Sequence, residues 1–176
     1  GRQVWQDILS RTSISTSVAS LSDIDADPVI DGGQVFAICK GGRMVALELS
    51  SGQRMWEQNI AGISTPWIAG EWLFVVTDEA KLIAVHRSNG RARWITQLRR
   101  WENEKGKSGP IFYYGPVLAG DRLIVVSSQG ALINVAPENG AVQSQIDMGA
   151  GVSLQPVVAG STLYILDDRG RLTAFR

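Results

Sequence analysis

The chain has 176 residues, and its 17 Lys and Arg side chains balance its 17 Asp and Glu side chains. Because the net charge is zero, no overall field attracts a nucleic acid or an anionic membrane surface, and we expect neither as a direct partner. One cysteine and one histidine exclude an internal disulfide and the usual soft-ligand metal sites, so we expect no metal and no cofactor.

Residues 1–9 are predicted to form a lone outer strand. The spacing from Gly1 to Trp5 returns later in the chain, where a turn glycine is again followed by tryptophan four residues on. The later pairs are Gly52 with Trp56 and Gly90 with Trp94. This strand therefore either belongs to a repeat unit whose other strands are missing, or pairs with the terminal strands in cis or in another copy.

Three alternating carboxylates follow at Asp23, Asp25 and Asp27. Alternating carboxylates open a calcium-binding EF-hand loop, but the glycine and the glutamate that such a loop requires are replaced here by Pro28 and Gln34. Two interpretations stay open for this segment. It is either a solvated turn whose aspartates cap backbone amides, or a loop that binds a basic side chain of a partner.

From Pro28 onward one pattern returns four times: a proline, three mainly apolar residues and a glycine, at spacings of 38, 50 and 40 residues. The four copies are Pro28–Gly32, Pro66–Gly70, Pro116–Gly120 and Pro156–Gly160. Each precedes a β-branched run, a turn, a third apolar run and a second glycine turn. Four short antiparallel strands in about 40 residues predict β-propeller blades.

The fold class predicted is therefore all-β, with residues 1–176 as a single partial propeller. A blade cannot bury both faces of its sheet alone, so neighbouring blades are expected to pack face to face, with Trp56 and Trp94 between them. The chain ends after a third strand, so its register is shifted by one strand relative to whole blades. About four blades' worth of strands is present.

The 50-residue spacing predicts an inserted loop at residues 99–112. Arg99 and Arg100 lie beside Trp101, a composition typical of protein interfaces. The competing interpretation is that residues 111–114 begin the next blade and that the charges only keep a long loop soluble.

The glycine-x-x-x-tryptophan turns resemble the repeats of quinone-dependent dehydrogenases and their non-enzymatic relatives. Among these, the whole chain resembles the C-terminal half of the BamB family, in the acidic segment from Leu21 to Val29 and in the blade from Met44 to Trp56. The resemblance implies an eight-bladed propeller that is lipid-anchored, through a part outside this chain, at the periplasmic face of the outer membrane. It also implies a scaffold that binds the periplasmic repeats of the BamA subunit, and unfolded barrel proteins, with Asp23 and Asp25 contacting BamA.

Two rival hypotheses remain, a fragment of a quinone-dependent dehydrogenase and an unrelated propeller scaffold. An enzyme is disfavoured, since His86 lies in an ordinary repeat position and Cys39 has no partner that would activate it. Calcium ligands and a catalytic aspartate for a quinone enzyme cannot be placed on this sequence. Pairing of two copies through open blade edges is a further expectation.

Overall fold

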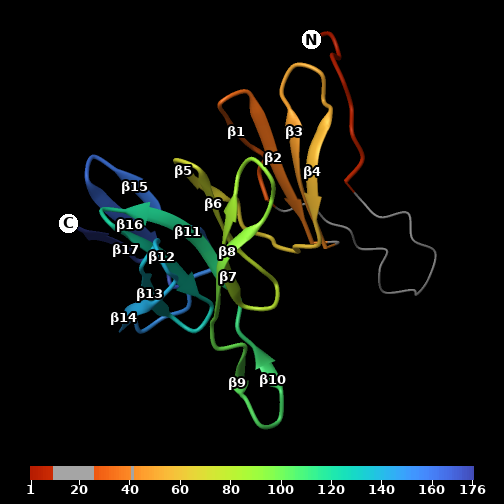
Figure 1. Cartoon of the computed structure of the whole chain (residues 1–176). Helices are drawn as coiled ribbons and strands as arrows, with labels where there is room; N and C mark the ends of the chain where they lie inside the picture. Colours follow the sequence, from red (N-terminus) through yellow and green to blue (C-terminus); the bar gives the residue numbers. More distant parts are fainter. Residues whose placement is uncertain (10–25, 41) are drawn as a thin grey trace.

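The computed structural model describes residues 1–9, 26–40 and 42–176, and every regular element in these ranges is a β-strand. Three four-stranded sheets and one three-stranded sheet follow one another along the chain, and a separate two-stranded hairpin lies between the second and the third. Within each sheet the strands pair antiparallel in chain order. The four larger sheets stack side by side in a row (Figure 1), and we call them blades 1 to 4.

The strands of each blade have the following bounds. Blade 1 contains β1 (Val29–Asp31), β2 (Gln34–Cys39), β3 (Arg43–Glu48) and β4 (Arg54–Gln58). Blade 2 contains β5 (Trp67–Ala69), β6 (Trp72–Val76), β7 (Lys81–His86) and β8 (Ala92–Gln97). Blade 3 contains β11 (Tyr113–Ala119), β12 (Arg122–Ser127), β13 (Ala131–Val135) and β14 (Val142–Asp147), and blade 4 contains β15 (Val157–Ala159), β16 (Thr162–Leu166) and β17 (Leu172–Phe175).

The second and third strands of blades 1 to 3 are buried on both faces. In β3 and β7 the four central residues are all buried, which explains why these strands are continuous apolar runs without alternation. The outer strand β14 is exposed along its whole length. The blades are therefore covered by their neighbours in the row, and not by a separate layer.

The hydrophobic core lies between consecutive blades. We call the face of a blade that packs on the next blade its forward face, and the opposite face its rear face. Phe36 and Met44 on the forward face of blade 1 pack against Leu73 and Val85 on the rear face of blade 2. Equivalent clusters lie between blades 2 and 3 and between blades 3 and 4. Each interface joins two sheets that could not stay folded alone in water.

Tryptophans connect neighbouring blades, as the sequence predicts. The indole N–H of Trp56 on β4 donates to the carbonyl oxygen of Arg87 in blade 2 at 2.6 Å, and its ring lies over Gly90. The indole N–H of Trp94 on β8 donates to the Pro137 carbonyl oxygen of blade 3 at 2.9 Å. The fourth strands of blades 1 and 2 are thereby fixed to the glycine turn of the next blade.

The segment 1–9 packs on the rear face of blade 1, and Trp5 contacts blade 1 as Trp56 contacts blade 2. The indole N–H of Trp5 donates to the carbonyl oxygen of Leu49 at 2.7 Å, and its ring lies over Gly52. No strand is formed within this segment, which differs from the expected lone outer strand. The reason is physical, since a strand is defined by a ladder of backbone hydrogen bonds, and no described strand pairs with this segment.

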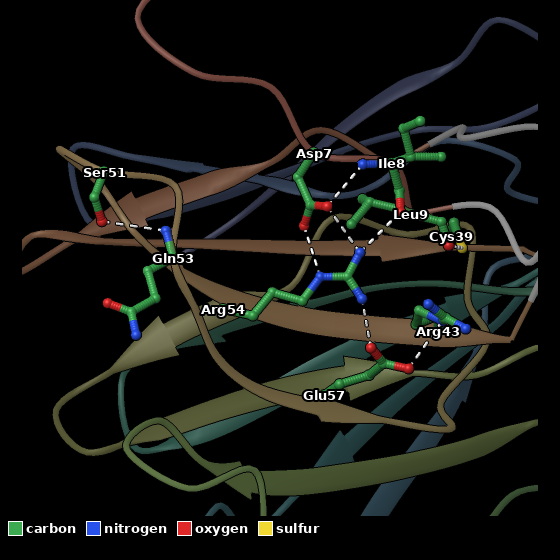
Figure 2. A network of polar contacts seen from close by, with 9 residues as sticks. All are labelled: Asp7, Ile8, Leu9, Cys39, Arg43, Ser51, Gln53, Arg54 and Glu57. Atoms are coloured by element: carbon green, nitrogen blue, oxygen red, sulfur yellow. Dashed lines mark hydrogen bonds and ion pairs between the residues drawn. The ribbon is translucent and has the colours of Figure 1, made fainter.

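A charged network holds segment 1–9 on blade 1 (Figure 2). The Arg54 guanidinium donates to both carboxylate oxygens of Asp7, at 2.7 and 2.9 Å, and to the Ile8 carbonyl oxygen at 2.8 Å. It also forms an ion pair with Glu57, and Glu57 forms a second ion pair with Arg43 at 3.0 Å. The Arg54 hydrogen bond lowers the pKa of Asp7 below its ordinary value, against an opposing effect of burial.

We expect the Asp7→Asn substitution to lower the free energy of unfolding by up to about 1 kcal/mol at pH 6, because the pair lies near the surface and is only partly buried. A carboxylate whose pKa is depressed in the folded state stabilises the protein above its unfolded pKa of about 4 and loses that contribution as the pH falls. The difference between the variant and the parent chain should therefore shrink between pH 5 and pH 3. Urea unfolding at several pH values measures it, and a constant difference would contradict the role of the Asp7 charge.

The two residues weighed as catalytic candidates have structural positions. Cys39 ends β2 and is 1% exposed, as expected for a core residue. His86 ends β7 and packs its ring edge-on against Trp72, with ring centroids 5.0 Å apart. The Nδ1 atom of His86 also lies 3.0 Å from the hydroxyl oxygen of Ser88, in the turn that follows β7.

Candidate functional site

The residues singled out from the sequence fall in two connections of the same type. Asp23 and Asp25 lie outside the described residues, in the part of the sequence that precedes β1. Arg99, Arg100 and Trp101 lie between β8 and β11. Both connections lead from the fourth-strand position of one unit to the first strand of the next blade.

The beginnings of the first strands are tied together across blades 1 to 3. The backbone N–H of Asp27 donates to the hydroxyl oxygen of Thr65, 3.2 Å away, just before β5. The neighbouring Ser64 is buried, and its hydroxyl donates to the carbonyl oxygen of Tyr113 at the start of β11. Asp27, which belongs to the acidic segment, is thus linked through the neighbouring residues Thr65 and Ser64 to the start of β11.

The segment 99–112, expected as a loop, contains a hairpin. Strands β9 (Trp101–Asn103) and β10 (Ser108–Pro110) pair antiparallel, and the hairpin extends away from the blades (Figure 1). The side-chain oxygen of Asn103 accepts from the backbone N–H of Gly106 at 3.0 Å and closes the turn. The sequence signal for it is the asparagine followed three residues later by glycine, which marks a turn between two short extended runs.

The root of the hairpin is firmly anchored. Leu98 and Ile111 flank it and are buried in the core between blades 2 and 3. The Tyr113 hydroxyl donates to the Arg99 carbonyl oxygen at 2.8 Å, and burial raises the pKa of Tyr113 above its ordinary value. The Gln129 side chain of blade 3 donates to the Glu102 carboxylate at 2.6 Å. The exposed part of the hairpin is therefore held in a defined orientation.

The hairpin displays a mixed aromatic and charged surface. The guanidinium of Arg100 lies over the ring of Trp101, 5.2 Å from its centroid. Arg99 donates to the carbonyl oxygens of Trp101 and Glu102, which fixes its side chain along β9. Arg99 and Arg100 are exposed and Trp101 is partly buried. A stacked Arg–Trp pair on a rigid support is a common element of protein-binding surfaces.

The aromatic residues after the hairpin separate into two roles. Tyr113 is buried and begins β11, so the structural interpretation of residues 111–114 holds for it. Phe112 is 49% exposed beside the hairpin root. A hollow of about 370 Å³ lies at the same root, lined among others by Leu98, Arg99 and Gln145. Phe112 and this hollow extend the candidate surface, and the sequence did not distinguish Phe112 from its buried neighbour.

Within the described ranges, no group of three or more His, Cys, Asp or Glu side chains could hold a metal ion. A hollow of about 590 Å³ lies between blades 3 and 4 and is lined mainly by aliphatic side chains with Arg122 and Asn134. The described residues also contain no helix long and apolar enough to cross a membrane.

Comparison with known proteins gives consistent results. The family model described as outer membrane protein assembly factor BamB matches residues 1–96 and 98–176. The BamB of Escherichia coli (strain K12) is 30% identical over 169 residues, which cover 94% of this chain and 40% of that protein. The chain thus spans less than half the length of this relative.

Solved structures show the same fold. The crystal structure of BamB from Moraxella catarrhalis matches with a TM-score of 0.75 at 16% identity, over 88% of this chain and 45% of that chain. A quinohemoprotein alcohol dehydrogenase from Comamonas testosteroni matches with a TM-score of 0.62 at 14% identity, over 84% of this chain and 29% of that chain. At these identities the likeness extends to the fold alone, and the predicted all-β architecture of propeller blades is confirmed.

Proposed function

Because the chain belongs to the family of the outer membrane protein assembly factor BamB, we propose that it acts as a non-catalytic scaffold in the assembly of outer-membrane β-barrel proteins. The observation that carries this proposal is the family match over almost the whole chain, joined to a blade architecture whose repeated glycines and tryptophans have structural roles. The relatives are named as assembly factors. The dehydrogenase likeness is weaker and is limited to the fold.

The proposed partner is the set of periplasmic repeats of BamA, and the proposed location is the periplasmic face of the outer membrane. A lipid anchor on a part of the protein outside this chain would hold it there. Asp23 and Asp25 would pair with basic side chains of BamA, since carboxylates recognise Arg through charge-assisted hydrogen bonds. The hairpin would supply a second contact through Arg99, Arg100 and Trp101.

The connection that contains Asp23 and Asp25 and the one that contains the hairpin are equivalent in blade order. The hydrogen bonds of Asp27 to Thr65 and of Ser64 to Tyr113 link the starts of the first strands, which supports a single partner that contacts both connections. An elongated partner would then meet a carboxylate pair and an Arg–Trp pair together. Such a surface combines electrostatic orientation with a buried aromatic anchor.

Unfolded barrel proteins are the proposed second class of ligand. Outer strands such as β14 have one edge that faces no described strand, and an extended peptide could add there through backbone hydrogen bonds. This mode needs no particular side chain, which suits a protein that handles many barrel sequences.

The proposal is tested by calorimetric titration of the chain with the periplasmic repeats of BamA from its own organism. We expect Asp23→Ala/Asp25→Ala to weaken binding at least about tenfold, which corresponds to roughly 1.4 kcal/mol. Arg100→Ala/Trp101→Ala should weaken it by a similar factor, because a stacked arginine and tryptophan are typical of residues that dominate interface energies.

Two matched controls accompany these variants. Asp121→Ala removes an exposed carboxylate from the turn between β11 and β12, and Lys105→Ala removes a charge from the hairpin turn but not from the Arg–Trp pair. Both should bind like the parent chain. Equal binding by all variants would reject the two contact sites, and absence of binding by the parent chain would reject the BamA proposal.

A further inference from the structure

We propose that two asparagine–glycine turns, Asn89–Gly90 in blade 2 and Asn139–Gly140 in blade 3, are sites of spontaneous deamidation that the joined blades keep slow. Each turn reacts when the blade that covers it separates, and the product prevents the two blades from joining in the same way again. This chemistry is independent of the scaffold function and of BamA, because it needs only the chain and water.

The reaction requires an asparagine followed by a residue that does not hinder ring closure. The backbone nitrogen of the glycine attacks the side-chain amide carbon of the asparagine. The bond from that carbon to the amide nitrogen breaks, and the nitrogen leaves as ammonia with the proton of the glycine N–H. Water then opens the cyclic succinimide to give aspartate or isoaspartate, so no oxidant or reductant is used. Glycine has no side chain to obstruct the attack, and asparagine is among the thermally labile residues.

The two turns have the same hydrogen bonds. The backbone N–H of Gly90 donates to the carbonyl oxygen of His86 at 2.8 Å, and the side-chain oxygen of Asn89 accepts from the backbone N–H of Arg91 at 2.9 Å. The turn of blade 3 repeats both bonds at the same two distances. For the attack, the glycine nitrogen must lose its proton and the asparagine amide must turn its carbon toward that nitrogen. Both movements break a hydrogen bond of the turn.

A tryptophan of the preceding blade covers each glycine. Gly90 is buried under the ring of Trp56, and a Cβ added to it would lie 2.8 Å from that ring. Gly140 is buried under the ring of Trp94, at 2.5 Å by the same measure, and its carbonyl oxygen accepts from the Thr96 hydroxyl. The turns have no room to change shape while the blades are joined. Local opening of the interface must therefore precede ring closure.

Blade 1 contains the same turn without the reactive amide. Ser51 takes the place of the asparagine, and its hydroxyl oxygen accepts from the backbone N–H of Gln53 at 3.2 Å. The backbone N–H of Gly52 donates to the Glu48 carbonyl oxygen at 2.9 Å, as the glycines of the other two turns do to their own partners. A serine oxygen thus closes this turn as an asparagine oxygen does, and it cannot form a succinimide. Serine is therefore the matched replacement for both asparagines.

The reactive asparagine lies between the two points that the covering tryptophan contacts. The indole N–H of Trp56 donates to the carbonyl oxygen of Arg87, which precedes Asn89, while its ring covers Gly90, which follows it. Trp94 contacts blade 3 in the same way. Isoaspartate lengthens the backbone by one carbon at this point, so the carbonyl oxygen and the glycine no longer have the spacing that the indole fits. The tryptophan then cannot regain both contacts.

Peptide mass spectrometry of the chain incubated at mildly alkaline pH measures the rate at each asparagine. We expect Asn89 and Asn139 to deamidate in urea, and at least about tenfold more slowly in the native chain, because the reaction then waits for the interface to open. Asn59 and Asn103 are followed by isoleucine and glutamate, and should react more slowly than both in urea. Equal rates in the native and unfolded chain, or no preference for the asparagine–glycine turns in urea, would overturn the proposal.

Two conservative variants test the role of each tryptophan. Trp56→Phe loses the indole donor, and under native conditions it should accelerate deamidation of Asn89 about tenfold with little change at Asn139. Trp94→Phe should have the converse effect. A general loss of stability would accelerate both sites equally, and that result would overturn the assignment of each turn to its tryptophan. Circular dichroism shows whether the variants fold, and if either does not, the native and unfolded parent chains decide the proposal.

Refolding after incubation tests the consequence of the modification. The parent chain is kept in urea until both turns have reacted, the urea is removed, and the midpoint of urea unfolding is measured again. We expect a lower midpoint than for a chain that was unfolded only briefly, whereas Asn89→Ser/Asn139→Ser should regain its original midpoint. An unchanged midpoint of the modified parent chain, or an equal loss in the double variant, would show that the product does not prevent the blades from joining.

Discussion

Replacing Trp56 by alanine is expected to lower the free energy of unfolding by about 3–5 kcal/mol, the usual cost of truncating a buried tryptophan. Trp56 is 9% exposed and belongs to the core between blades 1 and 2. The substitution removes the ring contact with Phe36 and leaves the carbonyl oxygen of Arg87 without its indole donor. Urea unfolding followed by circular dichroism measures the shift of the midpoint.

The matched control for this prediction is Trp101→Ala. Trp101 lies on the hairpin, is only partly buried and stacks with Arg100, outside the cores between the blades. Its removal should cost no more than about 1 kcal/mol. Equal losses for the two variants would show that Trp56 does not connect the blades in the way that its contacts indicate.

Replacing Gly90 by alanine is expected to cost on the order of 3 kcal/mol, from a left-handed backbone and a crowded neighbour together. Gly90 has a φ of +72°, which side chains rarely adopt, and an added Cβ would lie 2.8 Å from the ring of Trp56. The Trp56 ring would have to move, and its hydrogen bond to blade 2 would be strained.

Gly70 in the same blade separates the two causes. Its φ is +56°, but an added Cβ would meet no atom within 4 Å. We expect Gly70→Ala to cost about 1–2 kcal/mol, the backbone contribution alone. If both variants lose the same stability in urea unfolding, the close approach of Trp56 to the Gly90 turn adds nothing to the cost, and crowding by the indole ring is rejected as a cause.

The repeat pattern predicted most of the strands that the structure contains. The apolar runs at residues 35–38 and 73–76 are within β2 and β6, and the proline–glycine pattern marks each first strand. Such runs are informative because strands buried on both faces must be apolar at every position. The inter-blade position of Trp56 and Trp94 was also predictable, since a repeat with an apolar sheet on both faces needs large side chains to fill its interfaces.

The candidate site was less predictable. Sequence reasoning identified Arg99, Arg100 and Trp101 but expected a loop, because a three-residue strand has too little periodicity to be recognised. The exposure of Phe112 next to buried Tyr113 depends on which residue begins β11 and therefore on the fold. Asp23 and Asp25 lie outside the described residues, and their proposed role rests on the family resemblance.

By itself, the sequence determined the fold class, the order of the strands and the glycine turns, because these depend on local backbone preference and on the burial that a repeat imposes. Only the tertiary structure decided what segment 1–9 does. Its spacing predicts a strand, but a strand requires a partner, and the structure places the segment against blade 1 with no described sheet behind it. Tertiary structure likewise decided that the forward face of blade 4 is exposed while the equivalent face of blade 1 is buried, because burial depends on the neighbouring blade.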